Sequence, residues 1–127
     1  MIRALTVALA LLAGPALADG AALFANHCAV CHGTEGRGDG PTSTWLIRKP
    51  ADLTRLAVDN NGVFPVLRTL VRIDGRDPLM RSDIAMPAYG PVLGGEAVEV
   101  MIETGQGVLV PSELAEVLMW LVSIQED

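Results

Sequence analysis

The stretch Cys28-Ala29-Val30-Cys31-His32 decides the fold of this chain of 127 residues, and its cysteines are the only two in the sequence. In an exported protein, so close a pair fits a disulfide, a redox dithiol or a metal clip. A thioredoxin-like dithiol needs a βαβ context, which the glycine-rich sequence after His32 does not provide. A zinc site needs ligands from separate segments, whereas the candidate ligands here stand together between His27 and His32.

The histidine directly after the second cysteine favours a different interpretation. It completes Cys-x-x-Cys-His, the pattern of c-type haem attachment. In such sites the two thiolates bond to porphyrin vinyl groups and the imidazole ligates the iron. The motif therefore predicts one covalent haem c attached through Cys28 and Cys31, with His32 as an iron ligand. His27 is assigned to packing or to the surface.

The N-terminal segment, residues 1–18, has the pattern of a cleaved secretory signal peptide. Arg3 gives it a basic start, an apolar run follows from Ala4 to Leu12, and Ala16-Leu17-Ala18 is a small-x-small cleavage pattern. An uncleaved anchor is the alternative, but a Gly-Pro pair interrupts a run already shorter than the roughly 20 residues that span a bilayer. We expect export to the periplasm, one domain over residues 19–127, and no transmembrane segment in the mature chain.

The mature chain is acidic and its charge is unevenly placed. The full sequence has 9 basic and 15 acidic side chains, a formal charge of −6, and loss of Arg3 with the signal peptide makes the charge more negative. An acidic protein is a poor nucleic-acid binder. The other basic residues all lie between Arg37 and Arg81, whereas residues 83–127 contain acidic side chains and no basic ones. The molecule is dipolar if these segments occupy different faces; otherwise the charges only solvate the surface.

The first helix and the loop after it surround the attachment motif. Asp19 is a good N-cap for a helix that runs to Cys28. Gly20, Phe24 and Cys28 recur every fourth residue and share one face of this helix. The glycine-rich stretch from Gly33 to Gly40 cannot hold a helix, and we expect a loop along the edge of the haem.

Two further helices and one ambiguous stretch follow. A helix opens at Asn61 or Gly62, with Pro65 in its first turn, and ends before Gly75. Ser112 caps a last helix whose apolar stripe comprises Leu114, Val117, Leu118 and Leu121. Between them, residues 98–110 fit a small β-hairpin, because apolar and polar residues alternate around a glycine-rich turn. A short helix over residues 96–104 also fits, and the hairpin is only slightly favoured.

A six-coordinate iron needs a second axial ligand, and no histidine follows His32. The candidates downstream are four methionines: Met80, Met86, Met101 and Met119. We expect Met101 and Met119 to pack in regular elements. Met86 is preferred to Met80 because Pro87 restricts the backbone beside it. A thioether ligand raises the reduction potential and fills the position that oxygen or peroxide would need.

With these residues in hand, the chain resembles the class I single-haem cytochromes c over nearly all of its mature length. Gly20 and Phe24 match the glycine and aromatic positions of that family's first helix. The apolar and aromatic positions of its last helix are matched by Val117, Trp120 and Leu121. The resemblance implies that these two helices cross, in an all-α fold of about three to four helices around one covalent haem.

The resemblance also implies contacts around the haem. In this family the proximal histidine donates a hydrogen bond to a proline carbonyl, for which Pro41 is the best-matched position. Trp45, Arg48, Lys49 and Arg72 are candidate neighbours of the haem propionates. The loop sequences look like those of bacterial periplasmic members found with oxidases and dehydrogenases. Expected partners are redox proteins such as a periplasmic dehydrogenase or a membrane oxidoreductase.

Together these features predict a one-electron carrier or an electron-transfer subunit with His32 and Met86 as axial ligands, and not an enzyme in its own right. The alternative is a haem-based gas sensor or small peroxidase, in which Met86 leaves the sixth iron position open. A third alternative is a structural cytochrome domain in a larger complex. The iron ligation and reactivity of the haem distinguish the first two.

Overall fold

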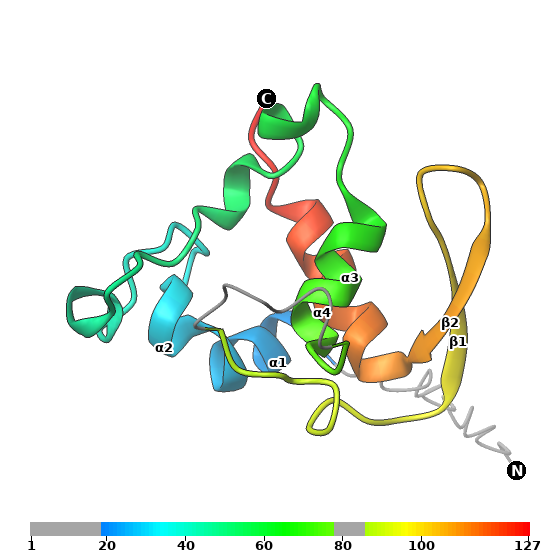
Figure 1. The fold of residues 1–127 in the computed structure, drawn as a ribbon, viewed down its shortest axis with the longest axis horizontal. Helices are drawn as coiled ribbons and strands as arrows, with labels where there is room; N and C mark the ends of the chain where they lie inside the picture. Colours follow the sequence, from blue (N-terminus) through cyan, green and yellow to red (C-terminus); the bar gives the residue numbers. More distant parts are fainter. Residues whose placement is uncertain (1–18, 78–85) are drawn as a thin grey trace, which may run out of the picture.

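The structure is a computed structural model that describes residues 19–77 and 86–127. The proposed signal peptide, residues 1–18, and Met80 lie outside the described residues. In chain order the α-helices and strands are α1 (Gly20–His27), α2 (Ala29–His32), α3 (Val66–Asp74), β1 (Ala97–Met101), β2 (Gly107–Pro111) and α4 (Ser112–Ser123). Three 3₁₀ turns, η1 (Ser43–Trp45), η2 (Leu53–Arg55) and η3 (Val58–Asn60), lie between α2 and α3. Figure 1 shows the helices grouped together and the hairpin at one end.

The attachment motif spans a break between two short helices. Asp19 caps α1 as predicted, since its carboxylate accepts a hydrogen bond from the backbone N–H of Ala21 at 3.0 Å. Cys28 follows the last residue of α1 and has φ −114°, so the chain turns before α2 begins. Cys28 is therefore the N-cap of α2, and Cys31 lies within α2, one residue before its end.

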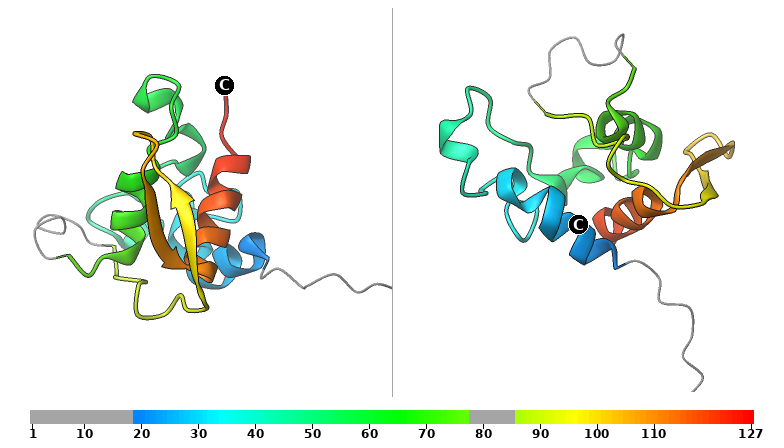
Figure 2. Two further views of the ribbon diagram at one scale, coloured as in Figure 1. Left: turned by 90° about the vertical axis from the view of Figure 1, so that its right-hand side faces the viewer. Right: turned by 90° about the horizontal axis from the view of Figure 1, so that it is seen from below.

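The first and last helices cross at close range, as the sequence predicts (Figure 2). A Cβ placed on Gly20 would lie 2.2 Å from the backbone oxygen of Glu116, so only glycine allows this approach. The rings of Phe24 and Trp120 pack with their centroids 4.1 Å apart. The predicted apolar stripe of α4 is buried at all four positions, Leu114, Val117, Leu118 and Leu121. The prediction that Ser112 caps this helix is wrong, because Ser112 is the first residue of α4 and the N-cap position falls on Pro111.

Helix α3 begins later than predicted. Asn61, with φ 59°, and Gly62, with φ 81°, both have left-handed backbones, so neither can open a right-handed helix. The helix starts after Pro65 and ends at Gly75, whose φ of 62° and N–H bond to the carbonyl of Val71 form a glycine C-cap. Its buried residues are Thr69, Leu70 and Ile73, while Leu67 is 43% exposed.

Residues 97–111 form the hairpin, and the alternative helix over residues 96–104 is wrong. Strands β1 and β2 pair antiparallel, with Glu99 opposite Leu109. The turn closes with a hydrogen bond from the N–H of Ile102 to the carbonyl of Gln106. Val100, Val108 and Val110 pack against the core, whereas Leu109 faces solvent. None of the helices in the described part of the chain is long and apolar enough to cross a membrane.

Candidate functional site

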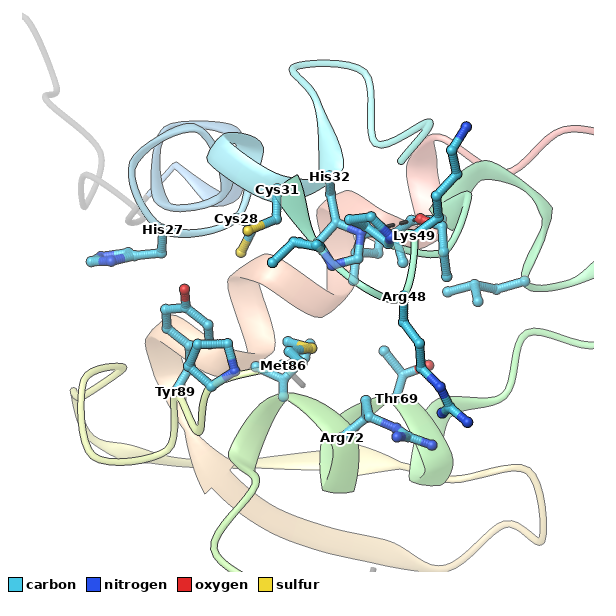
Figure 3. Close-up of a pocket in the computed structure, with 18 of the residues that line it drawn as sticks. His27, Cys28, Cys31, His32, Arg48, Lys49, Thr69, Arg72, Met86 and Tyr89 are labelled. Carbon is cyan, nitrogen blue, oxygen red and sulfur yellow. Dashed lines mark hydrogen bonds between the residues drawn. The ribbon is translucent and has the colours of Figure 1, made fainter. Parts of the chain in front are cut away.

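A largely apolar cavity of about 560 Å³ lies between α1–α2, the segment before η2, helix α3 and the chain after residue 86 (Figure 3). Its volume is in the range of about 300–1,000 Å³ that is typical of cofactor sites. The walls combine apolar, sulfur-bearing and cationic side chains. The residues that line it include Cys28, Cys31, His32, Arg48, Arg72 and Met86.

Both cysteine thiols border this cavity, and both are free. Burial raises the pKa of Cys28 to about 11, and the neighbouring Cys31 acts in the same direction. The hydroxyl oxygen of Thr42 lies 3.2 Å from the sulfur of Cys31 and donates its proton to the carbonyl of Val30 at 2.7 Å. Figure 3 shows the two sulfurs side by side on one wall of the cavity. A planar cofactor in the cavity would therefore meet both thiols along one edge.

His32 is held with one ring nitrogen engaged and its ring in the cavity. Its Nδ1 lies 3.1 Å from the backbone oxygen of Ala51. A carbonyl only accepts, so Nδ1 carries the hydrogen and Nε2 keeps the lone pair that a metal needs. Burial lowers the pKa of His32, which favours the neutral ligating form, and the bond to Ala51 opposes this shift in part. The arrangement fits a histidine that ligates iron.

The prediction that Pro41 accepts this hydrogen bond is wrong, because the acceptor is Ala51. The N–H groups of Gly40 and Thr42 bond to the carbonyls of Cys31 and Val30, so residues 40–42 lie against the backbone of α2. Gly38 meanwhile packs on the carbonyl of Pro50; a Cβ on Gly38 would lie 2.4 Å from that oxygen. This contact brings the following residue, Ala51, beside the histidine.

Met86 lines the same cavity and is partly buried against the core. Figure 3 shows its sulfur across the cavity from His32. Met101 and Met119 do not line the cavity and are 55% and 62% exposed, so the expectation that they pack internally is wrong. Among the described methionines, Met86 alone is positioned beside the cavity, and its role as an iron ligand belongs to the proposal below.

Four cationic side chains surround the cavity: Arg48, Lys49, Arg68 and Arg72. Three of them were expected near the cofactor: Arg48, Lys49 and Arg72. Arg68 was not predicted from the sequence, although it lies one helical turn before Arg72 on α3. Trp45 was also expected beside the cofactor, and this expectation is wrong. Its side chain is 84% exposed and does not line the cavity, because η1 is anchored by its buried Ser43 and turns the indole toward solvent.

Two further lining residues lie beside the cysteines, where sequence reasoning did not place them. His27 lines the cavity and meets Tyr89 edge to face, with ring centroids 6.2 Å apart. Burial raises the pKa of Tyr89, and the nearby cysteines Cys28 and Cys31 act in the same direction. Tyr89 follows Met86 by three residues in a loop without periodicity, so the sequence contains no signal for its position.

Two thiols on one wall and an imidazole with a free lone pair define a site for covalent c-type haem, and this donor set fits that group. The Cytochrome c family model matches residues 17–125, which include every described helix and strand. The chain therefore belongs to the cytochrome c family, whose haem-binding members transfer electrons. Searches of curated proteins and of solved structures found no match.

Proposed function

We propose that this protein is a periplasmic one-electron carrier, or an electron-transfer subunit, with one haem c attached to Cys28 and Cys31 and with His32 and Met86 as axial iron ligands. The observation that carries this proposal is the convergence of two thiols, an imidazole and a thioether on one cavity. The haem supplies a one-electron iron couple when bound.

The residues of the chain position and tune this group. Ala51 fixes the ring orientation of His32 and increases its basicity as a ligand. With haem bound, the thioether of Met86 would favour ferrous iron and would leave no open position for oxygen or peroxide. Apolar walls that include Ile73 and Leu121 exclude water and lower the local dielectric constant. Each of these contributions favours outer-sphere electron transfer over chemistry at the iron.

The periplasmic location rests on residues 1–18, whose basic start, apolar run and small-x-small pattern are those of a signal peptide. Covalent haem attachment through two thiols also suits export, because the thioethers retain the cofactor outside the cytoplasm. The partners we propose are a periplasmic dehydrogenase or a membrane oxidoreductase. Intact mass of the exported protein tests the location: we expect a chain that begins at Asp19 and carries one haem, and a chain with residues 1–18 retained would contradict cleavage.

Removal of the Met86 thioether tests the proposed ligation. The ferric wild-type protein is expected to show the weak sulfur-to-iron absorption band, and Met86→Ala is expected to lose it and to have a lower reduction potential. Met119→Ala is the matched control, because Met119 is 62% exposed and lies outside the cavity. Survival of the band in Met86→Ala, or its absence from the wild type, would assign the sixth position differently.

A further inference from the structure

The residues that follow helix α4 bond to a segment that lines the cavity. Figure 1 shows this C-terminal tail beside the 3₁₀ turns that precede α3. Within the tail, the side-chain amide of Gln125 makes three hydrogen bonds. Its Nε2 donates to the carbonyls of Leu53 at 2.7 Å and of Leu121 at 2.8 Å. Its Oε1 accepts from the N–H of Ala57 at 2.8 Å. Both donor hydrogens of the amide are therefore used.

Leu53 is bonded from two sides. Its N–H donates to the carbonyl of Gly36 at 2.6 Å, in the loop after the attachment motif, and its carbonyl accepts from Gln125. Its side chain lines the cavity and packs against the core. A Cβ on Gly36 would lie 3.0 Å from the side chain of Ile124 and 3.5 Å from the Cβ of Leu53. Leu53 thus joins the loop after the motif to the C-terminal tail.

The fixed position of Leu53 also fixes the carbonyl that His32 contacts. Leu53 stands two residues after Ala51, whose carbonyl lies 3.1 Å from the Nδ1 of His32. Between them, Asp52 accepts hydrogen bonds from the N–H and the hydroxyl of Thr54, at 3.0 and 2.6 Å, at the start of η2. Two residues of chain span at most roughly 7 Å, so the position of the Ala51 carbonyl follows that of Leu53.

The next residue of the tail supports the same segment. The N–H of Glu126 donates to the carbonyl of Thr54 at 2.8 Å. Its carboxylate pairs with Arg37 at 2.6 Å, but both side chains are exposed, so this ion pair contributes little by itself. The partly buried amide of Gln125 is therefore the main side-chain attachment of the tail to this segment.

We infer that Gln125 is a positioning residue for the proximal histidine. Its amide holds Leu53 and Ala57 in place. The carbonyl of Ala51 is thereby kept where it orients the ring of His32 and increases its basicity as a ligand. Gln125 does not line the cavity, so it acts through the intervening segment. This role rests on the proposed function of His32 as an iron ligand, whichever residue is the sixth ligand.

Hydrogen exchange in the haem-loaded Gln125→Met protein tests this role, because methionine has nearly the volume of glutamine, no charge and no amide. NMR of the ferrous protein measures two rates, that of the backbone N–H of Ala57 and that of the Nδ1–H of His32. We expect both to rise about fivefold, the effect of one lost hydrogen bond on local opening. A rise at Ala57 alone would show that Gln125 holds only its own turn and would overturn the inference.

The reduction potential is a second readout, which a purely structural role would not move. A less basic His32 stabilises ferric iron less, so Gln125→Met should have a higher potential than the wild type. Loss of a direct partner of a ligating histidine changes metal affinity by about 10–100-fold. Gln125 acts one step further away, and we expect a roughly three- to tenfold rise in the ratio of reduced to oxidised protein at a fixed solution potential. An unchanged ratio would contradict the inference.

Ser123→Ala is the matched control. The hydroxyl of Ser123 donates one hydrogen bond to the carbonyl of Trp120 at 2.6 Å, at the same end of α4, and this bond stays within the helix. Both exchange rates and the potential should stay those of the wild type. If Ser123→Ala shifts them as much as Gln125→Met does, general loosening of the end of α4 explains the effect and the inference fails.

A second variant, Gln125→Ala, removes the same three hydrogen bonds without the bulk of methionine and should give the same shifts. Failure of the inference is distinguishable from failure of the proposed function. A wild-type protein that lacks covalent haem, or that keeps its low-spin spectrum in His32→Ala, would contradict the proposed function and the inference together. If haem attachment and ligation by His32 hold but both Gln125 variants match the wild type, only the inference fails.

Discussion

At the scale of single residues, the orientation of His32 depends on a carbonyl 19 positions further along the chain, that of Ala51. The Cys-x-x-Cys-His spacing predicts the residues that hold the cofactor because their geometry is local to about one helical turn. It does not predict the second partner of the imidazole, which depends on the path of the loop between the motif and Ala51. The spacing therefore does not distinguish Pro41 from Ala51 as that partner, and Tyr89 is not predicted because it lies in a loop without periodicity.

Gly38→Ala tests how this hydrogen bond is supported. Gly38 has φ +78°, and an added Cβ would lie 2.4 Å from the oxygen of Pro50 and 3.1 Å from that of Ala51. We expect displacement of these carbonyls, a weaker bond to His32 and a less basic ligand, which destabilises ferric iron and raises the reduction potential. The measurement is a redox titration of the purified variant beside the wild type.

Gly105→Ala is the control for backbone strain, since Gly105 has φ +82° but no atom within 4 Å of the added Cβ. Left-handed strain alone should cost this variant about 1–2 kcal/mol of unfolding free energy. Its potential should stay that of the wild type. Equal potentials for Gly38→Ala, Gly105→Ala and the wild type would show that the packing of Gly38 on Pro50 does not tune His32.

At the scale of elements, the crossing of α1 and α4 follows from residues that are separated by most of the chain. The α4 stripe is a strong sequence signal because the apolar positions repeat with the helical period and all four are buried. The sequence of residues 97–101 is a weaker predictor of secondary structure, because the spacing of its apolar residues fits both a strand and a short helix. Tertiary packing of Val100, Val108 and Val110 on the core favours the hairpin. The late start of α3 reflects left-handed backbones at Asn61 and Gly62.

Gly20→Ala tests the crossing. In an isolated helix this change would stabilise by about 1 kcal/mol, but here the added Cβ would lie 2.2 Å from the backbone oxygen of Glu116. Overpacking of this kind should lower the unfolding free energy by about 1–3 kcal/mol. Denaturant unfolding followed by circular dichroism measures the change.

Gly94→Ala serves as the matched control, since the nearest atom to its added Cβ is a carboxylate oxygen of Glu113 at 3.9 Å. Its unfolding free energy should stay within about 0.5 kcal/mol of the wild type. If Gly20→Ala is as stable as Gly94→Ala, the two helices are not held at the distance described.

At the scale of the whole molecule, the basic and acidic segments of the chain are only partly separated, since Arg37 pairs with Glu126 near the C-terminus at 2.6 Å. Cationic residues gather around the cavity, while the hairpin and α4 contain acidic residues and no basic ones. The sequence predicts the segregation along the chain, but the fold was needed to place the cations beside the cavity. Such a charge distribution can orient the protein toward an anionic partner surface despite its negative net charge.

A potentiometric titration followed in the visible spectrum, under nitrogen and then under carbon monoxide, tests the central claim most directly. If His32 and Met86 both ligate the iron of a covalent haem, the protein titrates as a single one-electron couple with the same midpoint under both gases. A midpoint that rises under carbon monoxide, together with the spectrum of a carbon monoxide complex, would show an open iron position and contradict the assignment of an electron carrier.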